Sequence, residues 1–479
     1  MVNAFRSKIR NLCVKGIFAL VAVLMVLGGA PGKGRAETLA DALIGAYTHS
    51  GLLDQNRALL RAADEDVARA VSALRPIISW SAAIENGSVY GRSTLTPTIT
   101  DRNSTNLLLG LNAEILLYDG GSSKLAVEAA KETLLATRYN LVAIEQDVFL
   151  RTVSAFFTVI SAAEFVALRQ NNVRLISEQL RAAQDRFEVG EVTRTDVAQA
   201  ESRLAAGRSG LAVAQGDYFI AVEEYKNVVG RAPGNLVAPG RLPSIPGNID
   251  SAKNQAVRGH PFMLQVQREV AAAELNILRA KSDIRPRITL DGRIASDDKL
   301  GSSNFGQSAS VGLRMNQVIY GGGALSASVR QAIAFRDAAR GNLHRVRHDL
   351  QQNVGNAVAR LAVARAALES SEQQIVAARI AFDGIREEAA LGARTTLDVL
   401  DAEQELLDAQ ATRISAQAQQ YIAAYAVLSS IGTLTADGLN LAVQRYDPAA
   451  YYDLVKDAPT ASSRQGKQLD KVLKSLGKE

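Results

Sequence analysis

The sequence predicts a mixed α and β membrane protein made of two tandem structural repeats. Each repeat is expected to supply two barrel strands and one long helical hairpin, so that four strands and two hairpins come from each chain. Three observations lead to this prediction: sequence matches at one constant spacing, alternating segments of strand length, and very long segments without a helix breaker.

The first 36 residues have the three parts of a secretory signal peptide. A basic segment ends at Lys15, an apolar segment covers 16–27, and small residues precede a cleavage site after Ala36. An uncleaved anchor is the less favoured alternative, because the apolar segment is short for a membrane-spanning helix. The only cysteine, Cys13, lies in this leader, so the mature chain is expected to have no disulfide and no lipid-anchor cysteine.

The charge of the chain also depends on the leader. The formal net charge is +5, but the leader holds six basic residues and no acidic one, which leaves 48 basic against 49 acidic residues. The mature chain is therefore close to neutral, and its charge gives no reason to expect nucleic-acid binding.

The repeats are recognised by pairs of like residues that lie 202 positions apart. We assign repeat 1 to residues 37–231 and repeat 2 to residues 249–440. A Pro-rich linker at 232–248 joins them, and a polar C-terminal tail at 441–479 is expected to be poorly ordered or draped on the surface. The matched pairs are Tyr118 and Tyr320, Gly190 and Gly392, Asp196 and Asp398, Glu201 and Glu403, and Gly230 and Gly432.

Each repeat contains a pair of predicted strands, at about 76–118 and at about 286–320. Apolar and polar residues alternate there; Ile78, Trp80 and Ile84, for example, interleave with Ser79, Ser81 and Glu85. Such alternation places one face in an apolar medium and the other in a polar one, and the length suits a tilted membrane strand. The Gly-, Ser- and Asn-rich segments 87–104 and 297–307 are expected to be external loops. A half-buried hairpin of a soluble protein would show the same alternation.

The helices are the strongest local signal. Residues 122–189 form a run of 68 positions without Gly or Pro, which corresponds to roughly 100 Å of helix. The equivalent long helix of repeat 2 is expected at 324–391, and a second helix follows each at 195–229 and 395–431. Helices of this length are stable only when packed along their length. Gly190 and Gly392 are the expected reversal points.

A sheet of four strands cannot close into a barrel, yet a membrane-embedded sheet cannot leave its edges open. The chain is therefore expected to associate with copies of itself. Three copies would supply twelve strands, which is an allowed even number.

Several motifs resemble those of the TolC family of outer-membrane efflux proteins, over about residues 37–440. They are the turn Tyr118-Asp119-Gly120-Gly121, the tip sequences at 189–197 and 391–402, and the closing segment at 430–434. The resemblance implies a homotrimer with a 12-stranded transmembrane β-barrel, continued by a long α-helical coiled-coil tunnel through the periplasm.

The function implied by the resemblance is an exit duct of the outer membrane in a tripartite efflux or type I secretion system. Such a duct passes drugs, bile salts, dyes or proteins. The implied partners are a periplasmic adaptor (membrane fusion) protein, an inner-membrane pump of the RND or ABC type, and outer-membrane lipid. The cargo and the type of pump do not follow from the sequence.

The resemblance also assigns roles to residues near the two tips. Asp398 and Asp401 match the family's pore-constriction aspartates, and their i, i+3 spacing places them on one helix face. Three copies would give a ring of carboxylates that favours cations. The alternative is that both are acids in the first turn of a helix, where they are favourable in any case.

Arg394 matches a basic residue that holds the closed tunnel, and Thr195 and Asp196 match its partners. The alternative for these is unrelated helix capping, because Thr193 and Asp196 resemble a capping box. The family often has an aromatic closing residue where this chain has Ala389, so a second closing link is not expected. Four residues match the tip that meets the adaptor, although turn glycines and core apolar residues would look the same: Gly190, Val192, Gly392 and Leu397.

Other functions have little support in the sequence. His344 and His348 have the i, i+4 spacing of a metal pair, but no third ligand is nearby, so a solvated helix face is the preferred interpretation. We expect no metal site, no cofactor and no enzymatic activity, because no catalytic constellation is recognisable. The remaining alternative is a periplasmic coiled-coil adaptor or scaffold without a pore, against which the duplicated strand pairs argue.

Overall fold

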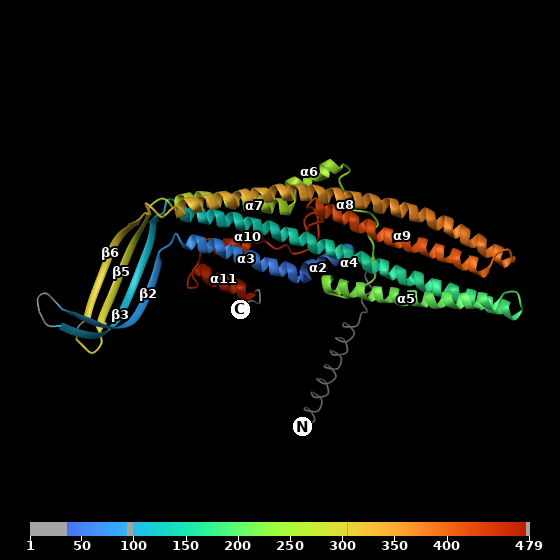
Figure 1. Cartoon of the computed structure of the whole chain (residues 1–479), viewed down its shortest axis with the longest axis horizontal. Coiled ribbons are helices and arrows are strands. Elements are labelled where there is room, and N and C mark those ends of the chain that lie inside the picture. The colour runs from blue at the N-terminus through green and yellow to red at the C-terminus, as the bar shows by residue number, and fades with distance from the viewer. Residues whose placement is uncertain (1–35, 93–98, 304, 476–479) are drawn as a thin grey trace, which may run out of the picture.

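The computed structural model describes residues 36–92, 99–303 and 305–475. The predicted leader lies outside these residues, apart from Ala36. The molecule is elongated, with a β-sheet at one end and the turns of two helical hairpins at the other (Figure 1). Each repeat runs in the same order, from two short helices through two strands to a long helix and its antiparallel partner.

The four long strands form one antiparallel sheet in the order β2-β3-β5-β6. The central pair, β3 and β5, joins the two repeats, because Leu111 of β3 lies opposite Ile294 of β5. The outer strands β2 and β6 have no further strand partner among the described residues. Apolar side chains on both outer strands are exposed; Trp80 is 71% and Val311 80% exposed. The strands are β2 (Ile77–Arg92), β3 (Ile99–Tyr118), β5 (Arg287–Lys299) and β6 (Phe305–Asn316).

The strands extend further than the sequence predicted. The loops predicted at 87–104 and 297–307 are therefore too long, because strand pairing continues into both segments. β2 and β3 stay paired as far as Arg92 and Ile99, and β5 and β6 as far as Asp298 and Phe305. Polar residues take part in this pairing, because strand hydrogen bonds use only the backbone. Asn86 adds a side-chain hydrogen bond across the pair, from its Nδ2 to Oγ1 of Thr105 at 3.0 Å.

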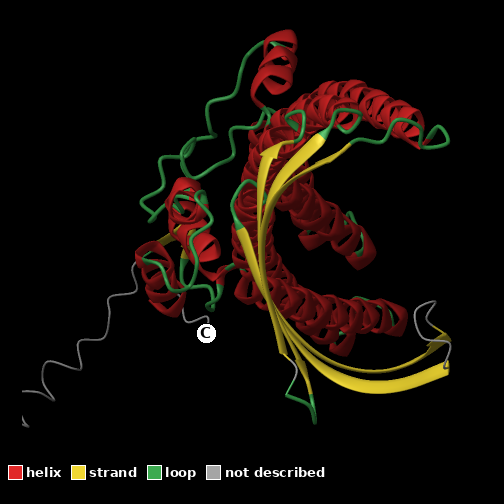
Figure 2. Ribbon diagram, turned by 90° about the vertical axis from the view of Figure 1, so that its left-hand side faces the viewer, coloured by secondary structure: helices red, strands yellow, loops and turns green. Residues whose placement is uncertain are grey.

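The long helices form two antiparallel hairpins, α4 with α5 and α8 with α9. α4 also packs against α9, so the two hairpins lie side by side, with α5 and α8 at the outer edges of the layer (Figure 1). The view along the molecule in Figure 2 shows strands and helices following one curved wall that is open on one side. The hairpin helices are α4 (Ser122–Glu188), α5 (Arg194–Val229), α8 (Ala324–Ala390) and α9 (Thr396–Ser430).

The shorter helices cover the half of the hairpins nearer the sheet. α7 lies between α4 and α8, and α3 packs against α4. The main core is centred here on Phe149, Val153 and Phe156 of α4, which have no exposed surface, and on Tyr225 of α5. Along α4 fewer side chains are buried toward the tip, whereas in α8 buried residues continue from Leu361 to Ala389, close to the tip. The shorter helices are α2 (Leu39–His49), α3 (Gly51–Ser72), α6 (Ile249–Gly259) and α7 (Pro261–Ser282).

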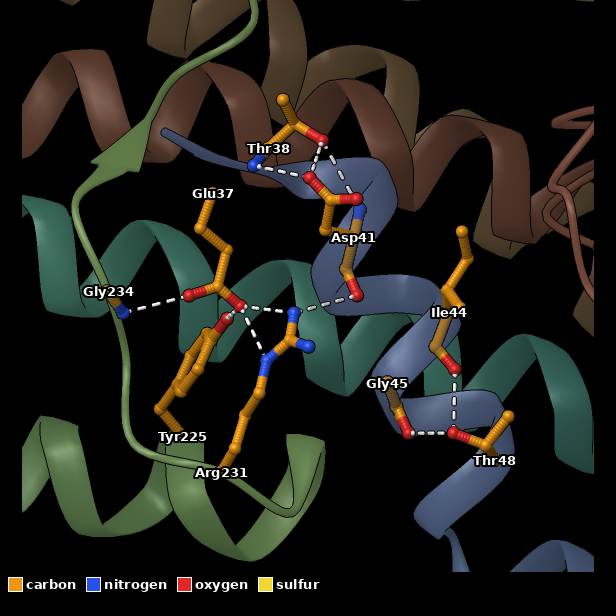
Figure 3. A network of polar contacts seen from close by, with 9 residues as sticks. All are labelled: Glu37, Thr38, Asp41, Ile44, Gly45, Thr48, Tyr225, Arg231 and Gly234. Carbon is orange, nitrogen blue, oxygen red and sulfur yellow. Dashed lines mark hydrogen bonds and ion pairs between the residues drawn. The ribbon is translucent and has the colours of Figure 1, made fainter. Parts of the chain in front are cut away.

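The segment that follows the predicted cleavage site is held by a buried carboxylate (Figure 3). Glu37 accepts hydrogen bonds from Tyr225 Oη at 2.7 Å, Arg231 Nη2 at 2.7 Å and the Gly234 N–H at 2.8 Å. Burial opposes ionisation, but these hydrogen bonds outweigh it and hold the pKa of Glu37 below its ordinary value. The segment after the predicted cleavage site is thus tied to the end of α5 and to the linker.

The linker and the tail both lie against the helices. In the linker, β4 (Leu236–Val237) pairs in parallel with β1 (Glu37–Thr38), and Tyr421 Oη donates to the Pro239 carbonyl at 2.6 Å. The tail forms α10 (Pro448–Val455) and α11 (Arg464–Ser475). Tyr451 of α10 donates to Glu65 Oε1 of α3 at 2.7 Å. The sequence left two alternatives for the tail, one poorly ordered and one draped on the surface. The described residues of the tail lie on the surface of the helices.

Candidate functional site

The two hairpin turns lie together at the end of the molecule far from the sheet and have the same construction (Figure 1). Gly190 and Gly392 both have φ of +81°, which is the left-handed conformation that glycine adopts without strain. The next residue closes each helix end: the N–H of Glu191 donates to the Arg186 carbonyl, and the N–H of Ala393 to the Glu388 carbonyl, each at 2.9 Å. This is the Schellman arrangement of a helix C-terminus.

A capping box then starts the second helix of each hairpin. In repeat 2, the Asp398 N–H donates to Thr395 Oγ1 at 3.2 Å, while Asp398 Oδ2 accepts from the Thr395 N–H at 2.9 Å and from its hydroxyl at 2.8 Å. Thr193 and Asp196 form the same box in repeat 1. The capping that the sequence suggested for Thr193 and Asp196 is therefore present.

Asp398 thus has a structural role in the chain, whatever its role in a pore. The hydrogen bonds from the backbone and side chain of Thr395 hold the pKa of Asp398 below its ordinary value, and the charge of Arg394 acts in the same direction. The carboxylate therefore remains ionised at neutral pH, and it lies in the first turn of α9, at the tip of the second hairpin.

Asp401, one turn further along α9, has a partner that the sequence analysis missed. Arg203 of α5 places its Nη2 2.5 Å from Oδ1 of Asp401. Both side chains are about half exposed. The pair joins the two hairpins within one chain, and it offsets the charge of one of the two predicted constriction aspartates.

The predicted closing link is not formed within the chain. Arg394 Nε donates to Glu388 Oε2 at 2.8 Å, and Asp196 Oδ2 accepts from the hydroxyl of Thr193 at 2.7 Å. Thr195 is exposed on the other hairpin. A link from Arg394 to Thr195 and Asp196 would require another arrangement of the tips or a neighbouring copy, so it remains a prediction.

A buried polar pair lies close by, because Glu403 follows Asp401 by two residues along α9. Glu403 of α9 is only 4% exposed, and its Oε1 accepts from Asn172 Nδ2 of α4 at 3.1 Å. Its other oxygen is buried without a partner in the described part of the chain. Burial raises the pKa of Glu403 to about 7, against the smaller opposing effect of the Asn172 hydrogen bond. The sequence showed this residue only as half of a repeat match, because nothing in the pattern places it inside.

The residues predicted to meet an adaptor are all at the tips. Gly190 and Gly392 are exposed and have open space around them, Leu397 is 38% exposed, and Val192 is half-buried. Ala389 fills the place of the absent aromatic residue, and it packs with Phe382 and Val399. These tip residues therefore present small and apolar groups around two turns of the same conformation.

No arrangement of three or more His, Cys, Asp or Glu side chains suitable for a metal ion occurs within residues 36–92, 99–303 and 305–475. His344 and His348 are both exposed on α8.

Comparison with known sequences gives matches over most of the chain. The family described as "Outer membrane efflux protein" matches residues 46–231 and 253–433, one segment in each repeat. The outer membrane efflux protein BepC of Brucella suis is 35% identical over 453 residues, which cover 94% of this chain and 97% of BepC. The outer membrane protein TolC of Escherichia coli is 25% identical over 312 residues, covering 62% of this chain and 63% of TolC.

Comparison with solved structures identifies the same fold. The Campylobacter jejuni CmeC outer membrane channel aligns with a TM-score of 0.74 at 16% identity, over 88% of this chain and 90% of CmeC. The Vibrio cholerae outer membrane protein VceC aligns with a TM-score of 0.70 at 19% identity, over 82% of this chain and 96% of VceC.

Proposed function

Because the chain belongs to the outer membrane efflux protein family and is an exit duct of the outer membrane with a large periplasmic portion, we propose that it works as a homotrimer. In this trimer, three four-stranded sheets form one 12-stranded barrel. The six hairpins form the wall of a periplasmic tunnel that ends at the tips. The family is one of channels rather than enzymes, and the duct takes the energy for transport from its partners.

The observation that carries the proposal is the open sheet joined to a curved helical wall. Among the described residues, β2 and β6 each have a strand neighbour on one side only, and apolar side chains on both are exposed. A bilayer tolerates such a sheet only if another copy pairs with each edge. The concave wall in Figure 2 would then enclose a passage.

We assign the gate of this passage to the tips. Asp398 and Asp401 would line its narrow end, where a carboxylate ring favours cations. Arg394, now paired with Glu388, would exchange that partner for Thr195 and Asp196 when the tips close together. Gly190, Val192, Gly392 and Leu397 would meet a periplasmic adaptor, which connects the duct to an inner-membrane pump of the RND or ABC type.

The cargo is proposed only by class. Relatives of this chain include the alkaline protease secretion protein AprF of Pseudomonas aeruginosa at 24% identity and the cobalt-zinc-cadmium resistance protein CzcC of Cupriavidus metallidurans at 24% identity. BepC, at higher identity, is an efflux protein. We therefore favour efflux of drugs, dyes and bile salts over protein secretion. A deletion strain should become sensitive to these compounds, and unchanged sensitivity would contradict this choice of cargo.

Conductance in a planar lipid bilayer tests the duct itself. The purified mature protein should give a small, cation-selective conductance, and Asp398→Ala with Asp401→Ala should shift the reversal potential toward zero under a salt gradient. Arg394→Ala should increase the open time by loosening closed tips. If folded oligomers of both the wild type and Arg394→Ala remain silent, the pore-free scaffold becomes the better interpretation.

A further inference from the structure

A charged pocket, which we call the junction pocket, lies where the sheet joins the helices. Figure 1 shows this junction at the opposite end of the long helices from the tips. The pocket has a volume of about 770 Å³, which is the size of sites that hold small organic molecules. Four arginines and three aspartates line it, together with alanine and serine side chains.

Two of the aspartates are held by the turn that leads into α4. Asp119 accepts from the N–H of Gly121 at 3.0 Å and from the N–H of Ser123 at 2.7 Å. Asp283 accepts from the hydroxyl of Ser122 at 2.8 Å. These carboxylates are therefore stabilised by donors of the chain itself and do not require a bound cation.

The arginines, in contrast, have donors to spare. A guanidinium group has five N–H donors. Arg69 donates to the third aspartate, Asp66, at 2.9 Å. Arg285 donates to the Gly120 carbonyl at 3.1 Å. The side chain of Arg279 makes no hydrogen bond or ion pair with the residues that the structure describes. The junction pocket thus offers unused N–H donors to an anion.

The turn before α4 also fixes the position of Arg285. Gly120 has φ of +69°, and a methyl group added to it would lie 2.6 Å from Cδ of Arg285. Only glycine allows the arginine to approach the turn so closely. A guanidinium group that is already positioned loses less freedom when it binds a ligand.

The pocket opens on the polar side of the sheet. Side chains alternate along β5, so Arg287, which lines the pocket, shares a face with Asp291 and Arg293. Leu290 and Ile294 lie on the other face. A membrane barrel turns its apolar face to lipid and its polar face to the interior. In the proposed trimer, the junction pocket would therefore face the passage.

Both repeats supply an arginine to the pocket. Arg69 and Arg279 are 210 positions apart, which is also the spacing of Arg75 and Arg285. The first two lie on α3 and α7, which both pack against α4. Arg75 does not line the pocket and donates instead to the Ala458 carbonyl of the tail at 2.8 Å. It is an internal control for Arg285, because it holds the equivalent place in the other repeat.

We propose that the junction pocket binds the carboxylate or sulfonate group of an organic anion that moves through the passage. Arg279 and Arg285 donate to this group, because charge-assisted hydrogen bonds from guanidinium suit a planar or branched anion. The alanine side chains of the lining contact the carbon skeleton of the ligand. The inference rests on the proposed duct and adds a binding site for one class of its cargo, which includes bile salts and excludes cationic dyes.

Chemical modification of arginine locates the anion. The full-length mature oligomer in lipid nanodiscs is treated with phenylglyoxal, with and without taurocholate, and the modified peptides are quantified by mass spectrometry. Taurocholate at about ten times its Kd should slow the modification of Arg279 and Arg285 by about tenfold. Arg75, which is also exposed, should react at an unchanged rate, and the organic cation ethidium should protect none of the three.

Substitution tests the same site by affinity. In calorimetric titrations with taurocholate, Arg279→Gln with Arg285→Gln should raise Kd by at least about tenfold, because two charged donors are lost. Arg75→Gln should leave Kd unchanged. Arg279→Gln alone breaks no contact within the described chain and should still weaken binding, so the test does not depend on the folding of the double variant.

The outcomes separate the inference from the proposed function. Conducting oligomers that bind no taurocholate, or that bind it without protection of Arg279, would overturn the junction pocket and leave the duct standing. Oligomers that show the protection but conduct no ions, either as wild type or as Arg394→Ala, would overturn the passage and with it the role of the pocket in transit.

Discussion

The two hairpins reverse with the same turn and the same capping box, but equivalent residues beyond the turn lie in different surroundings. Glu403 of repeat 2 is buried against α4, whereas Glu201 of repeat 1 is exposed. Phe157 is buried in a stack with Tyr421, whereas Ala359 is exposed beside a groove. The local signals of the duplicated sequence are enough to form the same turns. The difference arises because α4 and α9 pack together inside the chain, whereas α5 and α8 lie at its outer edges.

The largest effect should come from the aromatic stack. Phe157→Ala removes a ring that is 2% exposed and should lower the free energy of unfolding by about 3–5 kcal/mol. Ala359→Gly at the equivalent position should cost only about 1 kcal/mol, through helix propensity. Guanidinium denaturation in detergent, followed by circular dichroism, measures both. A loss for Phe157→Ala no larger than that for Ala359→Gly would show that the stack with Tyr421 contributes little to stability.

The next largest effect is a dependence of the free energy of unfolding on pH, which is caused by Glu403. Its pKa rises from an ordinary value of 4.5 to about 7 in the folded chain, so the folded state holds the proton more tightly than the unfolded state. The contribution to stability is complete below about pH 4.5 and is lost as the pH rises to about 7, a change of roughly 3 kcal/mol. Glu403→Gln should remove this pH dependence. Glu201→Gln should leave it intact, and a dependence that persists in Glu403→Gln would assign it to another group.

Substitution of a turn glycine should lower the stability by a smaller amount. This amount should be the same in both repeats. Gly190→Ala and Gly392→Ala each force an alanine to φ of +81°, and no atom beyond the two neighbouring residues lies within 4 Å of the added methyl group. The free energy of unfolding should therefore fall only because of the strained left-handed backbone, by about 1–2 kcal/mol. Thermal unfolding of the two variants should give matching shifts. A larger shift for one glycine would reveal a contact at that tip that the other lacks.

The smallest effect on stability is expected for the ion pair between the hairpins. Arg203→Ala breaks an exposed pair with Asp401 and should change the free energy of unfolding by less than about 1 kcal/mol. It should nevertheless increase cation selectivity, because it leaves the charge of Asp401 without its partner. Reversal potentials measured on Arg203→Ala and on Arg203→Lys, which keeps the charge, separate the two roles. Unchanged selectivity in Arg203→Ala would place Asp401 away from the passage.

Much of the candidate site could be predicted because its signals are local. Gly392 and the sequence Thr395-x-x-Asp398 specify a turn and a cap wherever they occur, since each hydrogen bond closes within six residues. The partners of Arg203 and Glu403 could not be predicted in this way. Each lies on another helix about 200 residues away in the sequence, and many residues of the same helices have the same polar character.

The sequence by itself determined the duplication, the two strand pairs and the two helical hairpins. These depend on periodicity and on the positions of Gly and Pro, which act within a few residues. The tertiary structure decided which faces of the hairpins meet, that the sheet leaves β2 and β6 as edges, and that the linker and the tail lie against the helices. The physical reason is that a helix face with small and apolar residues can pack against several others. Only the simultaneous fit of all the helices determines which of those contacts is made.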